Sequence, residues 1–239
     1  MTVCYDGRPY HGWQIQKNAV TVQEVLQEAL SGVLGSAPPI KGCSRTDAGV
    51  HALDFHVSMP LESDISCRNL VRALNSKLPE SVAVRECREV GEDFHARYSV
   101  KSKRYLYKIL NCPVRDPFYS GLALHYPKKL DETLMENEAR ALLGRHDFSA
   151  FCAAGGSVED KVRTVSAFSA ERSGDMIFLR ITADGFLYNM VRIITGTLID
   201  IERGKIERGS IGDIIDSLDR SRAGFTAPPD GLYLEKVEY

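Results

Sequence analysis

The feature that most constrains the fold is an alternation of strand-like and helical stretches in two similar halves. Apolar residues at helical spacing predict helices after Thr21, after Ser66, around 134–143, over about 187–203 and after Ser210. β-branched or alternating stretches predict strands at about 1–5, 54–59, 82–90, 104–110, 163–171, 176–183 and 232–238. Each half then has two principal helices. This order favours an α+β fold, with helices on one face of a largely antiparallel sheet.

Two ferredoxin-like halves that share this sheet fit the order of elements. The first helix has a clear beginning and end, because Thr21 and Glu24 have the spacing of a capping box and Gly35 follows its last apolar residue. The junction between the halves is expected near 99–102, without a linker rich in Pro or Ser. We therefore divide the chain into an N-terminal half, 1–101, and a C-terminal half, 102–239, rigidly joined.

The overall composition gives no sign of a nucleic-acid partner. The 239 residues carry a net charge of −2, so any affinity for RNA must come from a local cluster of positive charge. No apolar run approaches the roughly 20 residues that span a bilayer, and the chain starts in a strand without a signal peptide. We expect a cytoplasmic protein without a membrane partner.

The cysteines and histidines do not have the spacing of a metal site. The six cysteines are scattered without a Cys-x-x-Cys pair, and in a chain of this length they are typical of reduced thiols. His51 and His56 are five residues apart, which suits neither a helix face nor a strand face. The sequence also lacks a phosphate-binding loop and a dinucleotide fingerprint, so we expect no metal and no cofactor.

One acid lies in a loop of small and polar residues. The segment 42–52 reads Gly-Cys-Ser-Arg-Thr-Asp-Ala-Gly-Val-His-Ala and places Asp47 two positions after Arg45. Small residues beside Asp47 leave room for a large ligand to approach the backbone. An acid held beside a cation is a candidate nucleophile or general base. The alternative is that Asp47 only caps a turn.

A basic run with interleaved tyrosines is the candidate RNA-binding segment. Between 97 and 115 there are six basic residues and no acidic one: Arg97, Lys101, Lys103, Arg104, Lys108 and Arg115. Tyr98, Tyr105 and Tyr107 lie among them. Cations for phosphates and aromatic rings for bases are what unpaired nucleotides require. A solvated strand edge is the alternative. Trp13 is another residue that could stack on RNA, although a core anchor is the commoner role.

Four further segments and the Asp47 loop together resemble the tRNA pseudouridine synthases of the TruA type. These segments are 5–7 with 10–14, 103–107, 184–192 and 231–234. They occur in the order of that family and cover essentially the whole chain. Ser44 departs from the family, in which Gly is common, and so does Phe225, where Pro is frequent. Neither departure affects a catalytic side chain.

The resemblance implies a role for each candidate residue. Asp47 matches the invariant nucleophile, which attacks the uracil ring or the sugar carbon C1′, or assists formation of a glycal. Arg192 matches the cation that keeps this acid ionised, because burial alone would raise its pKa. Arg45 matches the residue that extrudes the base, and Tyr105 the one that stacks on it. Lys101, Lys103, Arg104, His11 and Gln14 are further candidate RNA contacts.

The resemblance also implies the substrate and the assembly. The expected substrate is the anticodon stem-loop of tRNA, at about positions 38–40. It is expected to bind in a cleft between the two halves of the chain, and the protein is expected to be a homodimer. Two alternatives remain open on the residues alone. A non-catalytic RNA-binding protein would need only the basic strand, and an aspartyl-phosphate hydrolase would need a second carboxylate near Asp47 to bind Mg²⁺.

Overall fold

The computed structural model describes residues 1–156 and 158–239, which form two compact units. Unit 1 consists of Met1–Lys101 with Tyr233–Tyr239, and unit 2 of Ser102–Leu232. The sequence division had placed 233–239 in the second half. These residues belong to unit 1 because β10 (Leu232–Glu238) pairs in parallel with β3 (His51–Ser58), with Tyr233 opposite His51.

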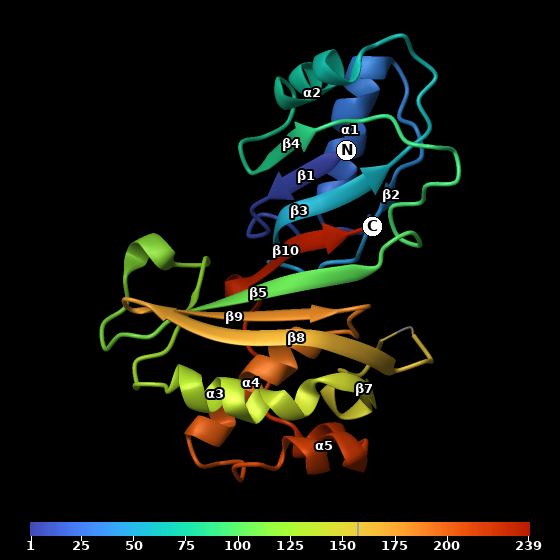
Figure 1. Cartoon of the computed structure of the whole chain (residues 1–239). Helices are drawn as coiled ribbons and strands as arrows, with labels where there is room; N and C mark the ends of the chain where they lie inside the picture. The colour runs from blue at the N-terminus through green and yellow to red at the C-terminus, as the bar shows by residue number, and fades with distance from the viewer. Residues whose placement is uncertain (157) are drawn as a thin grey trace. The chain divides into compact units, whose positions relative to one another are not determined.

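Unit 1 has the ferredoxin-like order of elements. In chain order these are β1 (Thr2–Tyr5), α1 (Val22–Leu34), β2 (Lys41–Gly42), β3, α2 (Cys67–Asn75) and β4 (Val82–Glu86). β1 lies between β4 and β3, β2 pairs with β3, and these pairs are antiparallel. The resulting strand order, β4-β1-β3-β2, is that of the split β-α-β pattern. Both helices lie on one face of this sheet (Figure 1).

The first helix begins and ends where the sequence predicts. The amide of Glu24 donates to the hydroxyl of Thr21 at 3.3 Å, and the amide of Thr21 donates to the carboxylate of Glu24 at 3.4 Å. Gly35 ends the helix with a φ of +79°, in the left-handed region that glycine adopts without strain. Leu26 and Leu30 are completely buried on its inner face. The predicted capping box is confirmed.

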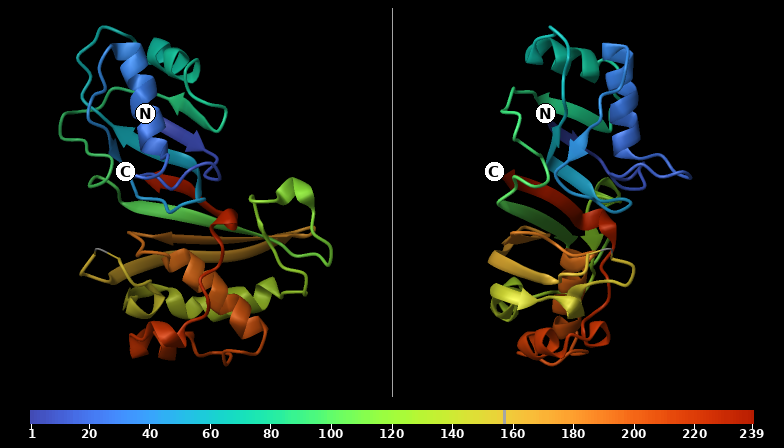
Figure 2. Two further views of the ribbon diagram at one scale, coloured as in Figure 1. Left: turned by 180° about the vertical axis from the view of Figure 1, so that it is seen from behind. Right: turned by 90° about the vertical axis from the view of Figure 1, so that its right-hand side faces the viewer.

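Unit 2 contains the remaining strands and helices. In chain order they are β5 (Ser102–Leu110), β6 (Leu124–His125), α3 (Glu132–Ala139), β7 (Gly144–Asp147), β8 (Val162–Ser173), β9 (Met176–Ala183), α4 (Met190–Glu202) and α5 (Ile211–Ser217). The strand order β5-β9-β8-β7 is antiparallel, and β6 adds to β5 in parallel. Figure 2 shows α3 and α4 against the same face of this sheet. Short 3-10 turns occur at Pro117–Tyr119, Arg140–Leu142, Ser149–Phe151, Arg220–Arg222 and Pro229–Gly231.

The predicted α+β class with largely antiparallel strands is confirmed, while some element boundaries differ. α3 ends at Ala139, because a 3-10 turn follows and Gly144 then starts β7 opposite Val165. α4 starts at Met190 because Asn189 has a φ of +60°, which an α-helix does not accommodate. Strands β2, β6 and β7 are two to four residues long and were not predicted. Among the described residues, no helix combines the length and the apolar character that crossing a bilayer requires.

Candidate functional site

The segment 43–50, called the Asp47 loop below, is fixed to the residues that follow β1. The amide of Trp13 donates to the carbonyl of Thr46 at 3.1 Å, and the amide of Gly49 donates to the carbonyl of Tyr10 at 3.2 Å. The hydroxyls of Tyr5 and Thr46 are hydrogen-bonded at 2.8 Å in a buried position. These three bonds hold the loop on both sides of Asp47.

Two glycines let the backbones of these segments approach closely. A Cβ on Gly7 would lie 2.1 Å from the carbonyl oxygen of Val50, and one on Gly12 would lie 2.3 Å from that of Thr46. Gly12 also has a φ of +85°. Any larger residue would therefore push the loop away from segment 5–13. The family resemblance singled out both positions, and the structure supplies the physical reason for glycine there.

Asp47 lies at the start of a tight turn. Its carbonyl accepts the amide of Val50 at 3.1 Å, and Gly49 within this turn has a φ of +78°. Asp47 is half-buried, whereas Arg45 is exposed and Thr46 between them is buried. The loop thus presents alternate side chains to the outside and to the core of unit 1. The local geometry is that of a carboxylate on a rigid support.

His51, which ends the motif, has a supporting role that sequence reasoning missed. The residue is 1% exposed, and its ring stacks on Tyr233 with ring centroids 4.5 Å apart. Its Nδ1 accepts the amide of Gly7 at 3.1 Å and lies 3.2 Å from a carboxylate oxygen of Asp6. Nδ1 of His51 thus contacts both the backbone of Gly7 and the side chain of Asp6, in the turn that meets the Asp47 loop. The only sequence signal was the position of His51 inside the motif.

The carboxylate of Asp6 belongs to the same cluster. Burial raises its pKa, but the side-chain and backbone hydrogen bonds from Arg8, together with the Arg8 charge, outweigh burial and lower the pKa overall. The amide and Nε of Arg8 donate to this carboxylate at 3.0 and 3.1 Å. Asp6 is therefore ionised near neutrality and helps to fix the turn that meets the Asp47 loop.

The other candidates in unit 1 lie on or next to this support. His11 and Gln14 are exposed, as is Lys101 at the end of the N-terminal segment. Trp13 is 2% exposed and stacks on Phe55 with ring centroids 4.1 Å apart. The two roles left open for Trp13 are thereby decided in favour of the core anchor.

Unit 2 carries the candidate residues of β5. Tyr105 is 6% exposed and meets Phe186 edge to face, with centroids 4.9 Å apart at 81°. Tyr107, two residues further on, donates its hydroxyl to the carbonyl of Pro228 at 2.7 Å, and burial raises its pKa. Lys103 and Arg104 are half-buried on the same strand. Tyr107, a neighbour of Tyr105 on β5, thus remains protonated and has a structural role.

Arg192 is held in place by its own unit. Its Nε donates to the carbonyl of Ala227 at 2.7 Å, and its Nη1 donates to the side-chain oxygen of Asn189 at 2.7 Å. Asn189 reaches this position because it adopts the left-handed conformation just before α4. The segment around Ala227 is itself held against α4, because the amide of Ala227 donates to the carbonyl of Arg192 at 3.1 Å and the amide of Gly224 donates to the hydroxyl of Thr197 at 2.9 Å. The guanidinium is therefore oriented before any ligand binds.

The structure thus groups the candidates in two sets. Asp47, Arg45, His11, Gln14 and Lys101 belong to unit 1. Tyr105, Lys103, Arg104 and Arg192 belong to unit 2. In unit 1 the backbone of segment 10–13 contacts the Asp47 loop directly. In unit 2 burial raises the pKa of Tyr107, and the charge of Arg192 partly offsets this increase.

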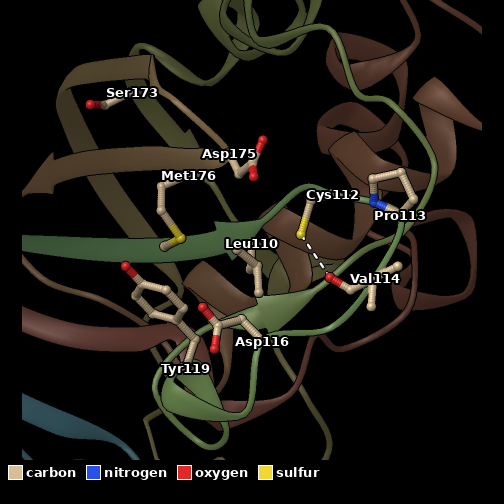
Figure 3. Close-up of a pocket in the computed structure, with 9 residues that line it drawn as sticks. All are labelled: Leu110, Cys112, Pro113, Val114, Asp116, Tyr119, Ser173, Asp175 and Met176. Atoms are coloured by element: carbon tan, nitrogen blue, oxygen red, sulfur yellow. Dashed lines mark hydrogen bonds between the residues drawn. The ribbon is translucent and has the colours of Figure 1, made fainter.

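A separate pocket lies at the far end of β5, by the turn between β8 and β9 (Figure 3). It has a volume of about 560 Å³ and is lined by Leu110, Cys112, Pro113, Val114, Asp116, Tyr119, Ser173, Asp175 and Met176. Its charged groups are two carboxylates, which repel phosphate. None of the residues predicted for the site lines this pocket, and its lining disfavours RNA.

Comparison with known proteins gives a consistent result over the whole chain. A family described as tRNA pseudouridine synthase matches residues 1–99 and 139–239. Three relatives carry the name tRNA pseudouridine synthase A. That of Thermoanaerobacter sp. (strain X514) is 48% identical over 241 residues, which cover 100% of this chain and 98% of the relative.

The other two relatives are similar in extent. That of Acetivibrio thermocellus is 46% identical over 235 residues, covering 98% of this chain and 96% of the relative. That of Ruminiclostridium cellulolyticum is 45% identical over 240 residues, covering 100% and 98%. Identity of this level over full length, together with the α+β fold and the Asp47 loop, shows that the chain belongs to the tRNA pseudouridine synthase family and is an isomerase that acts on tRNA.

Proposed function

We propose that the chain isomerises uridine to pseudouridine in the anticodon stem-loop of tRNA, at about positions 38–40, with Asp47 as the nucleophile. The observation that carries this proposal is the rigid presentation of a half-buried carboxylate between Thr46 and Gly49, both fixed by backbone hydrogen bonds. Covalent catalysis depends on holding the reacting group in place, because misplacement by about 1 Å can cost 10²-fold in rate.

The reaction moves one base without a net gain or loss of atoms. The bond between N1 of uracil and C1′ of ribose breaks, the base rotates, C5 bonds to C1′, and the C5 proton is lost while N1 gains one. Asp47 acts on the uracil ring or on C1′, or removes a sugar proton to form a glycal, and the proposal covers all three routes. The target nucleotide must first leave its helical stack, at a cost of a few kcal/mol.

Arg192 is proposed as the cation that keeps Asp47 ionised. A half-buried carboxylate needs compensation, because burial raises its pKa and a nearby guanidinium lowers it by about 1–3 units. In support, Nε and Nη1 of Arg192 are already bound to Ala227 and Asn189, so the guanidinium is oriented without further loss of side-chain entropy.

The remaining candidates are proposed to bind RNA. Tyr105 would stack on the everted base, supported by its position edge-on to Phe186, which limits motion of its ring. Arg45, exposed beside Asp47, would enter the place that the base leaves and hold the RNA backbone. Phosphate and ribose contacts are assigned to Lys101, Lys103, Arg104, His11 and Gln14.

Two further parts of the proposal concern assembly and location. We infer a homodimer in which one tRNA contacts both subunits, and sedimentation as a monomer at micromolar concentration would contradict it. We also infer that the protein acts in the cytoplasm. All six cysteines are free thiols, which suits a reducing compartment.

The aspartyl-phosphate alternative has little support. It needs a second carboxylate near Asp47 for Mg²⁺, and the next acid in sequence is Asp54. The carboxylate of Asp54 instead accepts the amide of Val237 at 3.0 Å and is bonded to Nε2 of His56 at 2.9 Å. It serves to hold β10 against β3. Activity without Mg²⁺ would exclude the hydrolase.

The test is the mapping of pseudouridine in unmodified tRNA after incubation with the protein. The proposal predicts new pseudouridine at positions 38–40 and nowhere else. Tight tRNA binding without any pseudouridine would instead support the non-catalytic alternative. Modification confined to another arm of the tRNA would leave the chemistry intact and overturn the proposed target.

A further inference from the structure

We propose that Tyr5 and Thr46 form a positioning pair for Asp47, in which the hydroxyl–hydroxyl bond sets the place of the carboxylate rather than the stability of the fold. The inference rests on the proposed function, since it takes Asp47 as the reacting group. Neither Tyr5 nor Thr46 is assigned contact with substrate. Their effect on the reaction passes through the backbone of the Asp47 loop.

The bond between the two hydroxyls is well shielded. The Tyr5 Oη and Thr46 Oγ1 atoms lie 2.8 Å apart, in residues that are 5% and 7% exposed. The two residues are 41 positions apart in sequence, so the bond links a strand end to the loop directly beside Asp47. A buried polar side chain at this place has few other ways to satisfy its hydrogen bonds.

The position of the Tyr5 hydroxyl is set by the sheet. Tyr5 is the last residue of β1 and is paired on one side with Ala52 of β3 and on the other with Val82 of β4. Its ring also contacts Phe55, with centroids 5.6 Å apart. The sheet and the Phe55 contact thus fix the Tyr5 hydroxyl, and the Thr46 side chain that bonds to it is fixed in turn.

Thr46 is held at two atoms that lie on different parts of the residue. Its carbonyl accepts the amide of Trp13, and its side chain bonds Tyr5. Two such anchors leave little freedom of rotation about the Thr46 backbone. Because Asp47 follows directly, any rotation about the Thr46 backbone also displaces the Asp47 carboxylate.

Substitutions at Tyr5 and Thr46 can distinguish an effect on the position of Asp47 from an effect on the stability of the fold. Phe has the shape of Tyr without the hydroxyl, and Val has nearly the shape of Thr without the hydroxyl. Removing one hydroxyl takes this bond from its buried partner and destabilises the fold, whereas removing both replaces the pair by two apolar side chains at a smaller expected cost. Stability and position can therefore be separated by experiment, because the double variant is expected to recover stability without restoring the bond that positions Asp47.

The experiment measures kcat and KM of pseudouridine formation in the steady state, together with thermal unfolding, on four variants of the full chain. Tyr5→Phe and Thr46→Val should each lower kcat about 10- to 100-fold with little change in KM. Thr46→Ser, which keeps the hydroxyl, should retain most of the activity. The double variant Tyr5→Phe with Thr46→Val should regain the Tm lost by the single variants but not the lost kcat.

A matched control is available in the same unit. The hydroxyl of Tyr239 donates to the carbonyl of Ala96 at 2.9 Å, so Tyr239→Phe also removes a tyrosine hydroxyl bond within unit 1, and this bond involves no residue of 43–50 and neither Tyr10 nor Trp13. This control should keep its kcat. It shows whether the loss of any such bond is enough to reduce the rate.

Three outcomes decide the matter. Recovery of kcat together with Tm in the double variant would show that the pair only stabilises the fold, and the proposal would be wrong. Unchanged kcat in both single variants, with Asp47→Ala inactive, would overturn the pair while leaving the proposed function intact. Full activity of Asp47→Ala would overturn the proposed function first, and the pair with it.

Discussion

Gly12 offers a demanding test of the idea that the Asp47 loop must be held in one place. A Cβ at position 12 would lie 2.3 Å from the carbonyl oxygen of Thr46, and real contacts of this kind are not shorter than 3.0 Å. In Gly12→Ala the two backbones must therefore separate by about 0.7 Å. A shift of this size next to Asp47 should reduce kcat by roughly 10- to 100-fold.

The same substitution has a separate cost in stability. Gly12 has a φ of +85°, and an alanine held in this left-handed region costs of order 1–3 kcal/mol. Because domains are typically stable by about 5–15 kcal/mol, the variant should remain folded. The loss of kcat and the loss of stability are then measured on the same folded protein, by steady-state product formation and by chemical denaturation.

Gly35→Ala is the matched control for Gly12→Ala. Gly35 has a φ of +79°, so its alanine variant is also held in the left-handed region, but nothing lies within 4 Å of its added Cβ. It should lose stability and keep its kcat. If Gly12→Ala has the same kcat as Gly35→Ala, close approach at Thr46 does not position Asp47 and the reasoning is refuted.

Three further predictions concern other contacts. Asn189→Gly keeps the left-handed backbone but removes the side-chain oxygen that accepts a hydrogen bond from Nη1 of Arg192, so kcat should fall about tenfold. Asn189→Asp keeps an acceptor and should stay active. Equal rates for the two variants would contradict this. The hydrogen bond from His56 and the amide bound by its carboxylate outweigh burial and hold the pKa of Asp54 below its usual 3.8, so its stabilising effect is present above that pH and lost as the pH falls through the lower folded pKa. Denaturation of Asp54→Asn should therefore show a deficit of about 1 kcal/mol at pH 7 that shrinks towards pH 3, and a deficit that grows on acidification would refute it. Thr21→Ala should lower the free energy of unfolding by about 1 kcal/mol and Thr21→Ser should restore it, whereas equal stability of both would deny the capping box a role.

Much of the fold could be predicted because its signals are local. The helix after Thr21 is defined by its own cap, its own apolar face and Gly35, and the structure reproduces all three. The short strands β2, β6 and β7 carry no such signal. Their residues are extended because a partner strand is present, as where Gly144 faces Val165, and that partner is distant in sequence.

The site shows the same division between local and distant causes. The residue types around Asp47 predicted a tight irregular loop, and Gly49 with its φ of +78° confirms it. The contacts that hold the loop could not be predicted, because Tyr5 meets Thr46 across 41 residues and Gly7 meets His51 across 44. Such pairs form only when the sheet aligns them. Nor does composition indicate that β10 returns to β3, since the end of a chain can pair with any open strand edge.

The central claim is that a single carboxylate on this fixed loop performs the chemistry. The most direct measurement is pseudouridine formation by Asp47→Ala in a single turnover, with unmodified tRNA and saturating enzyme. The account predicts a variant with the unfolding transition and tRNA affinity of the parent protein and with no product. Product above the enzyme-free background, from a variant shown to be free of parent protein, would contradict it.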